Sequence, residues 1–209
     1  DNVTGKTLYT GELRPVHGSW LEFSTTRHET ITVKIDRRRK FLASTFLRAI
    51  GISTNERVAE RFRELEGPSV TSGQAATNYI ENTLAKDETV ETEDALVEIF
   101  KRMHPGEPVV LEKVKENFNG MFFNSRRYDL GAVGRYKINK KLSDTHGFYP
   151  AKPETRILTV EDIIGTIAYL IRLAQGHEGI DDIDSLANRR IRRVGELVAT
   201  TAFRIGVLR

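Results

Sequence analysis

The sequence predicts an α+β fold in which a small antiparallel β-sheet near the N-terminus packs with a mostly helical remainder. Two observations lead to this prediction. Apolar and polar residues alternate in short runs within residues 8–36, which is the period of strands with one buried face. From residue 41 onwards apolar residues recur at helical spacing between glycine and proline breaks. The 209 residues are enough for one substantial core.

The strands are predicted from this alternation. Leu8–Val16 and Ser19–Phe23 are expected to form two of them. Thr30–Asp36 alternates most clearly, with isoleucine and valine on one face. The polar stretch Thr25–Glu29 predicts a hairpin between the last two strands.

Helices are expected through most of the remaining chain. Each is predicted from an apolar stripe and from residues that favour helix ends. The predicted helices are Phe41–Ile50 ended by Gly51, the segment from a capping box at Ser53–Glu56 to about Leu65, the segment from an N-cap at Thr92 to Met103, Val110–Phe118 ended by Gly120, the segment from an N-cap at Thr159 to Gly176, and Asn188–Arg209 with Ile191, Val194, Leu197, Val198 and Phe203 facing a core. Residues 69–91 are expected to be a linker with one short helical face.

Composition narrows the classes of function. The absence of cysteine excludes disulfides and cysteine-bound zinc or iron–sulfur sites. The five histidines do not pair at a metal-ligand spacing, and no nucleophile elbow, P-loop or D-x-D-x-D cluster occurs. We therefore assign no catalytic residue and predict that this chain alone is not an enzyme. No stretch approaches the ~20 apolar residues of a membrane helix.

Trp20 is the only tryptophan of the chain. Leu21 and Phe23 are expected to face the core, so Trp20 and Glu22 point to the opposite face of the sheet. A tryptophan on a polar face can stack on a nucleobase, which contributes roughly 1–3 kcal/mol per base. The alternative is a tryptophan half-buried at a junction between subdomains.

The net charge of +3 is modest, so contact with nucleic acid must come from local clusters of cations. One cluster is Arg37–Lys40, directly after Asp36. We interpret it either as a basic surface loop or as a loop that contacts phosphates. Asp36 is expected to orient an arginine through a bidentate pair. A further basic edge is predicted at Arg135, Lys137, Lys140 and Lys141.

The second cluster is Arg189–Arg193, which lies within the stretch 181–196, DDIDSLANRRIRRVGE. The aspartates of this stretch suit the start of a helix, where the dipole is positive, but the arginines that follow do not. The arginines indicate an anionic partner or carboxylates elsewhere in the fold. The alternative is a solvent-exposed helix start with internal Asp–Arg pairs.

Five blocks of sequence, in order along the chain, resemble the lobe (β2) region of the bacterial DNA-directed RNA polymerase β subunit. They are GSWLEF at 18–23, KIDRRRK at 34–40, RMHPGEP at 102–108, RYDLGAVGRYKINKKL at 127–142 and DDIDxxxNRRIRxVGE at 181–196. The resemblance implies that residues 1–180 form the lobe and residues 181–209 a connecting helix toward the fork region, either separate or within the same compact domain. We expect the chain to be a domain of a longer subunit.

The resemblance also implies a nucleic-acid-binding site. Its residues here are Trp20, Asp36, Arg37, Ile183, Asp184 and Arg189. Trp20 is expected to stack on the nontemplate strand, and the loop at Asp36–Arg37 to lie close to that strand. Asp184 and Arg189 are expected to hold an unstacked guanine against Ile183. Ser185 and Ala187 depart from the family pattern, which has histidine and glycine there, and a further family arginine precedes Asp1.

The partners implied by the resemblance are the nontemplate strand, the downstream duplex, the β′, α and ω subunits, σ and transcription regulators. No cofactor is expected in this chain, because β′ holds the catalytic magnesium in this family. The implied location is the bacterial cytoplasm, with the nucleoid. An alternative function is a protein-interaction module that presents a docking surface to σ, elongation or regulatory factors, and a stand-alone helical adaptor is a third.

Overall fold

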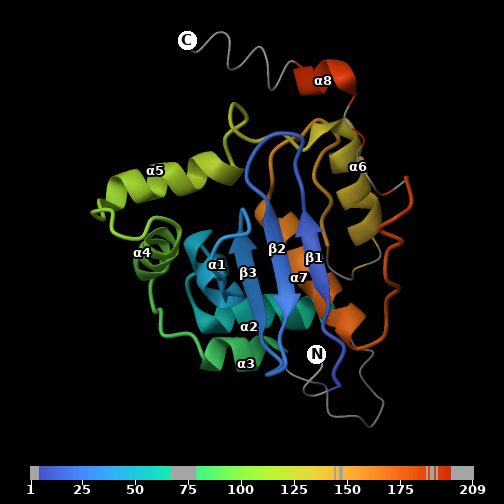
Figure 1. Ribbon diagram of the computed structural model, residues 1–209. Helices are drawn as coiled ribbons and strands as arrows, with labels where there is room; N and C mark the ends of the chain where they lie inside the picture. Colours follow the sequence, from blue (N-terminus) through green and yellow to red (C-terminus); the bar gives the residue numbers. More distant parts are fainter. Residues whose placement is uncertain are drawn as a thin grey trace, which may run out of the picture. The chain divides into compact units, whose positions relative to one another are not determined.

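The computed structural model describes residues 5–66, 79–143, 145, 148–186, 188, 191 and 193–198, without the side chains of 63–66 and 196. The chain divides into two compact units, Asp1–Glu178 and Gly179–Arg209, and each is described by itself. The predicted α+β class is confirmed: an antiparallel sheet near the N-terminus is followed by helices (Figure 1).

The sheet contains four strands in the order of the sequence. They are β1 (Thr10–Leu13), β2 (Leu21–Thr25), β3 (Ile31–Ile35) and β4 (Phe41–Leu42). The predicted hairpin between β2 and β3 is present, with Phe23 opposite Val33. The strand predicted over Leu8–Val16 is shorter, because Thr10–Leu13 alone pairs with β2. The short β4 was missed: Phe41 and Leu42 pair with β3, so the helix expected from Phe41 begins only at Ala43.

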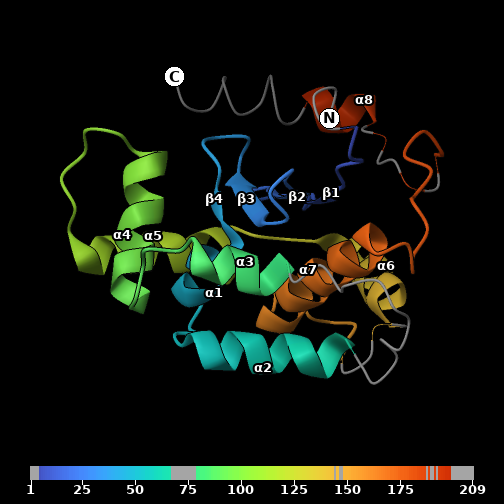
Figure 2. The same cartoon turned by 90° about the horizontal axis from the view of Figure 1, so that it is seen from below.

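Helices cover the apolar face of the sheet. α1 (Ala43–Ala49) packs against β3, and α7 (Val160–Ala174) packs against β1 and β2. α3 (Tyr79–Ala85) also contacts β3. Further out, α2 (Asn55–Glu66) packs on α7, as Figure 2 shows. The alternation of β2 and β3 explains this arrangement, because Leu21, Phe23, Val33 and Ile35 are buried on one face.

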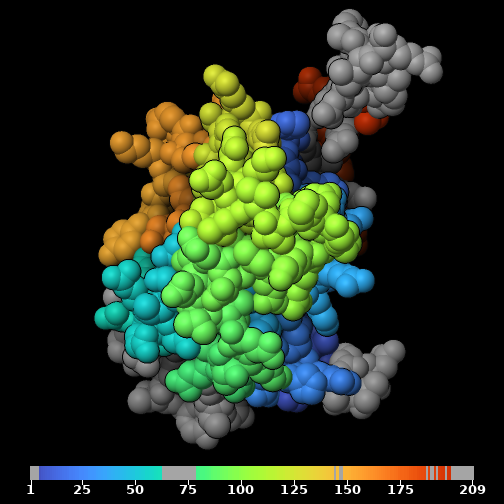
Figure 3. Space-filling view, turned by 90° about the vertical axis from the view of Figure 1, so that its left-hand side faces the viewer, coloured from blue at the N-terminus to red at the C-terminus, as the bar shows by residue number. Residues whose placement is uncertain are grey.

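The remaining helices of the first unit are α4 (Thr92–Met103), α5 (Leu111–Phe122) and α6 (Gly131–Leu142). α4 packs on α1 and on α5, and together α4 and α5 form much of one face of this unit (Figure 3). α6 packs against α7. The core they enclose is centred on Phe46, whose ring contacts those of Phe118 and Phe122 at 5.7 Å between centroids.

Several predicted helix ends are confirmed. Thr159 caps α7 through a capping box with Asp162, and Gly51 and Gly176 follow α1 and α7 with positive φ. The prediction for Thr92 was wrong by one residue, because Glu91 is the N-cap and Thr92 the first residue of α4.

The helix end predicted at Gly120 was also wrong. α5 continues through this residue to Phe122. A Cβ atom at Gly120 would lie 3.1 Å from Nη1 of Arg127. The glycine therefore makes room for a neighbouring side chain and does not end the helix.

The described part of the second unit contains the short helix α8 (Val194–Val198). The prediction that its apolar residues face a core was wrong for those described: Ile191, Val194, Leu197 and Val198 are exposed. Phe203 lies outside the described residues.

Candidate nucleic-acid interface

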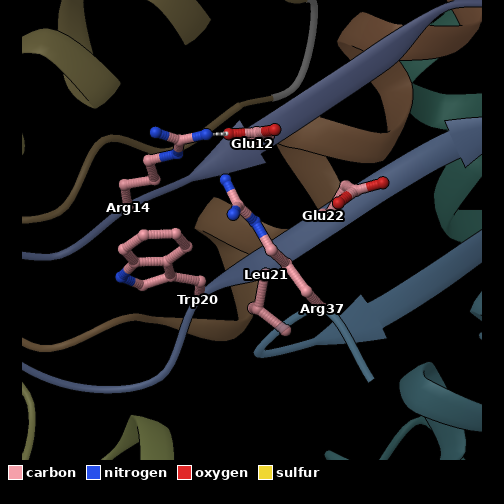
Figure 4. A pocket seen from close by; sticks show the side chains of 6 residues that line it. All are labelled: Glu12, Arg14, Trp20, Leu21, Glu22 and Arg37. Atoms are coloured by element: carbon pink, nitrogen blue, oxygen red, sulfur yellow. Dashed lines mark ion pairs between the residues drawn. The ribbon is translucent and has the colours of Figure 1, made fainter. Parts of the chain in front are cut away.

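Trp20, Arg14 and Arg37 come together at one end of the sheet. Arg14 follows the last residue of β1, Trp20 precedes β2, and Arg37 lies just beyond β3. Because neighbouring strands are antiparallel, the end of β1, the start of β2 and the end of β3 lie at the same end of the sheet. The side chains converge there around a small hollow that Glu12 and Glu22 also line (Figure 4).

The backbone of Trp20 is fixed by Asp36. The Trp20 N–H donates to Oδ1 of Asp36 at 2.7 Å, and the Asp36 N–H donates to the Trp20 carbonyl at 3.0 Å. The expectation that Asp36 orients an arginine is therefore corrected, because the carboxylate of Asp36 accepts a hydrogen bond from the Trp20 backbone. Trp20 itself is half-buried and, as predicted, lies on the opposite face from the buried Leu21 and Phe23.

Arg37 is held in a strained turn. Asp36 and Arg37 have φ values of 48° and 58°, and the Arg38 N–H donates to the Ile35 carbonyl at 2.9 Å. Consecutive positive φ values are the pattern of a type I′ turn, which ordinarily uses asparagine, aspartate or glycine. An arginine there costs about 1–2 kcal/mol. Strained backbone of this kind gathers at functional sites.

Two guanidinium groups lie close to the indole of Trp20. The Cζ atoms of Arg14 and Arg37 are 4.8 Å and 5.2 Å from the ring centroid, within the range of cation–π attraction. Arg14 also forms an ion pair with Glu12. The only tryptophan of the chain is thus partly exposed and lies beside two arginines, with Glu12 and Glu22 lining the same hollow.

The remaining cations of the loop Arg37–Lys40 do not all point the same way. Arg38 donates to the carbonyl of Met103 at the end of α4. The Lys40 carbonyl accepts from Nη1 of Arg102 at 2.6 Å. These contacts join the loop to α4, while Arg39 is exposed. The reading of a basic surface loop and that of a phosphate-contacting loop both fit this geometry.

The basic edge predicted on α6 is wrong for Arg135. This side chain is fully buried and pairs with Asp162 of α7, so it is not available to a phosphate. Lys140 is exposed and lies 6.0 Å from the ring of Tyr136, and Lys141 lies 4.7 Å from that of Tyr169. Whether these lysines contact DNA stays a prediction.

In the second unit, Asp182 organises the turn that carries two of the predicted residues. Its Oδ1 accepts the N–H groups of Asp184 and Ser185 at 3.1 Å and 3.2 Å, which is an Asx turn. Asp184 is exposed, and Ile183 is 76% exposed. Arg189, the predicted donor to guanine, lies outside the described residues.

Sequence reasoning missed Arg14 and Glu12. The strand register, which the structure supplies, identifies them. Leu13 pairs with Leu21, so continuing the ladder by one residue places Arg14 opposite Trp20. Glu12 and Arg14 are two residues apart and therefore share a face. Within the described residues no group of three or more histidine, cysteine, aspartate or glutamate side chains could hold a metal ion.

The comparisons with known proteins define the class. The chain matches the model of the family RNA polymerase Rpb2, domain 2, over residues 2–192, and belongs to that family. Two curated relatives from strains of Dehalococcoides mccartyi, both named DNA-directed RNA polymerase subunit beta, are 41% identical over 212 residues. The resemblance to the RNA polymerase β subunit, drawn from the five sequence blocks, is thereby confirmed.

The matched region covers 100% of this chain and 16% of each relative. The chain thus spans less than a fifth of the length of the curated relatives it matches. None of the helices that the structure describes is long and apolar enough to cross a membrane.

Proposed function

We propose that this chain is part of an RNA polymerase β subunit, where it forms a wall of the downstream DNA cleft and contacts the nontemplate strand. The family membership supports the first half of this proposal. The observation that carries the second half is Trp20, which lies half-buried on the outer face of the sheet beside the guanidinium groups of Arg14 and Arg37.

This environment suits a single strand of nucleic acid. An indole offers a stacking surface to any base, and arginines bind the phosphates beside it. Asp36 supports the contact indirectly, because it fixes the Trp20 backbone. The strain at Arg37 favours a functional reason for an arginine at this position.

A second contact is proposed at Ile183, Asp184 and Arg189. A carboxylate accepts from the N1–H and N2–H groups of guanine, and an arginine donates to O6 and N7. Asp184 lies on a turn that Asp182 stabilises, and it is exposed, so its carboxylate is accessible to an unstacked base. Ile183, exposed beside it, supplies an apolar contact to the same base.

Nucleotidyl transfer is proposed as an activity of the assembled polymerase only. In that assembly β′ supplies the magnesium site, and β′, α, ω and σ are the protein partners, together with the downstream duplex. The bacterial cytoplasm, with its nucleoid, is the proposed location. This chain contributes binding surface and no catalytic residue.

Titration of the chain with short single-stranded oligonucleotides tests the proposal. Two readouts are followed at two salt concentrations: anisotropy of a labelled oligonucleotide and the fluorescence of Trp20, which reports on this site alone because no second tryptophan exists. We expect salt-sensitive binding that quenches Trp20 and is lost in Trp20→Ala. An oligonucleotide with one guanine is expected to bind more tightly than its adenine counterpart, and Arg189→Ala removes that difference.

Binding that leaves the fluorescence of Trp20 unchanged and is blind to both substitutions would contradict the proposed site. If the chain does not bind the oligonucleotide even at low salt, the proposal that this chain contacts the strand directly is contradicted. Lys115→Gln is the control, because Lys115 is an exposed cation paired with Glu93 on α4 and α5.

A further inference from the structure

We infer that Arg14 is a nucleic-acid-contacting residue of this site, which exchanges its ion pair with Glu12 for a phosphate of the strand stacked on Trp20. This inference rests on the proposed function. In the free protein Arg14 is occupied by two groups at once, the carboxylate of Glu12 and the ring of Trp20 (Figure 4).

The position of Arg14 follows from the hairpin. β1 is the edge strand of the sheet, and Pro15, which has no N–H to donate, follows Arg14 directly. The side chain of Arg14 is 49% exposed, so it is accessible beside the indole. A nucleotide whose base stacks on Trp20 carries its phosphate next to that base, and Arg14 is within reach of both.

The charges around Arg14 make the exchange possible. Glu12 stands directly opposite Glu22 in the β1–β2 register, an arrangement of like charges that is unfavourable by itself. Lys34 pairs with Glu22 at 2.7 Å, from the opposite position in β3. Glu12 is thereby left to Arg14.

The pair of Arg14 with Glu12 is a weak competitor for a phosphate. Both side chains are exposed, at 49% and 38%, and exposed ion pairs contribute little because water screens them. A phosphate offers a guanidinium the same bidentate geometry as a carboxylate, with more negative charge on the strand as a whole. Glu12 is therefore a positioning residue that holds Arg14 over the indole until a strand arrives.

Arg37 is not equivalent to Arg14. Its Cζ lies at a similar distance from the ring, but its backbone is fixed in the turn after β3. Among the residues that the structure describes, Arg14 alone of the two is paired with a carboxylate that a phosphate must displace. This difference predicts a coupling between Glu12 and Arg14 that a general charge effect does not produce.

The test is a double-mutant cycle on oligonucleotide binding, read by Trp20 fluorescence and by anisotropy over a series of salt concentrations. Arg14→Gln is expected to weaken binding roughly three- to tenfold and to reduce the slope of log affinity against log salt by about 0.7, the value for one phosphate of a single strand. Glu12→Gln is expected to strengthen binding up to roughly fivefold. The strengthening must disappear when Arg14→Gln is also present.

Lys115→Gln and Glu93→Gln are the matched controls, since they remove the same charges from an exposed pair on α4 and α5. An Arg14→Gln protein that binds as well as the unsubstituted chain, with an unchanged salt slope, would overturn the inference and leave the proposed function standing. A Glu12→Gln effect that persists without Arg14 would overturn it too, because the effect would then be one of net charge. If the unsubstituted chain shows no quenching of Trp20, the proposed function fails first and the inference with it.

Discussion

Arg135 of α6 donates to both carboxylate oxygens of Asp162 of α7, at 2.6 Å and 2.9 Å, in a pair that is fully shielded from solvent. The guanidinium also donates to the carbonyls of Thr155 and Ile157, at 2.7 Å and 2.6 Å. Asp162 in turn accepts the N–H of Thr159 at 2.8 Å, within the capping box of α7. One buried network thus joins α6, the segment that precedes α7 and the start of α7 itself.

Breaking this pair is expected to destabilise the first unit strongly. Arg135→Ala leaves the Asp162 carboxylate buried without its cation, which costs about 3–5 kcal/mol. The free energy of unfolding from urea titration, followed by circular dichroism, measures this loss. Lys115→Ala is the control, because Lys115 of α5 pairs with Glu93 of α4 at the surface and such pairs contribute about 0.5 kcal/mol. Equal losses in the two variants would contradict the assigned role of Arg135.

Two helical glycines are expected to respond oppositely to alanine. At Gly165 of α7 a Cβ would lie 2.9 Å from Cδ2 of Phe148 and 3.0 Å from Cδ1 of Leu142, so Gly165→Ala is expected to cost about 1–3 kcal/mol. At Gly134 of α6 the nearest atom is the Cβ of Leu130 at 3.5 Å. Gly134→Ala is expected to stabilise the helix by about 0.5–1 kcal/mol. Thermal unfolding of both variants measures these changes in stability. A stabilising Gly165→Ala would contradict the prediction, because it would show that Phe148 and Leu142 move aside at little cost.

Arg37 is expected to trade stability for binding. Arg37→Gly and Arg37→Ala both remove the contact with Trp20, but only glycine relieves the positive φ of 58°. We expect the glycine variant to be about 1 kcal/mol more stable than the alanine variant, with both binding single strands more weakly than the unsubstituted chain. The comparison needs urea unfolding and the oligonucleotide titration on the same preparations. If the two variants are equally stable, Arg37 is not strained.

Tyr128 is expected to make stability fall at alkaline pH. Burial, and the nearby carboxylate of Asp162, raise the pKa of Tyr128 well above its ordinary value. Below about pH 10 the phenol is protonated in both states, whereas above it the unfolded chain ionises first. The unfolded state then binds fewer protons, so the free energy of unfolding falls by up to about 1.4 kcal/mol per pH unit until the folded pKa is reached.

Tyr128→Phe is expected to remove this part of the pH dependence. Among the described residues the Tyr128 hydroxyl has no hydrogen-bond partner, so the change at neutral pH is expected to be small, below about 1 kcal/mol. Urea unfolding at about pH 8 and about pH 11 measures the effect. Tyr136→Phe serves as the control, because Tyr136 is 63% exposed. If the Tyr128→Phe variant loses as much stability between the two pH values as the unsubstituted chain does, the loss at alkaline pH comes from other groups.

The local features of this fold follow from the sequence because they depend on near neighbours. The alternation of Leu21 and Phe23 determines that Trp20 faces outward, since side chains of a strand alternate between its two faces. The capping box at Thr159 and the glycine after α7 mark that helix from its own residues. The family was equally readable, because its blocks are stretches of consecutive residues.

Tertiary structure decided what each charge does. Arg135 belongs to a stretch that looks like a basic edge, yet its partner Asp162 lies 27 residues away on another helix and removes it from solvent. Gly120 looks like a helix stop, but the close approach of Arg127 explains it. Arg14 becomes a neighbour of Trp20 only when β1 and β2 pair. Sequence periodicity determines which face a residue occupies, whereas the group that meets it there is set by contacts distant in the chain.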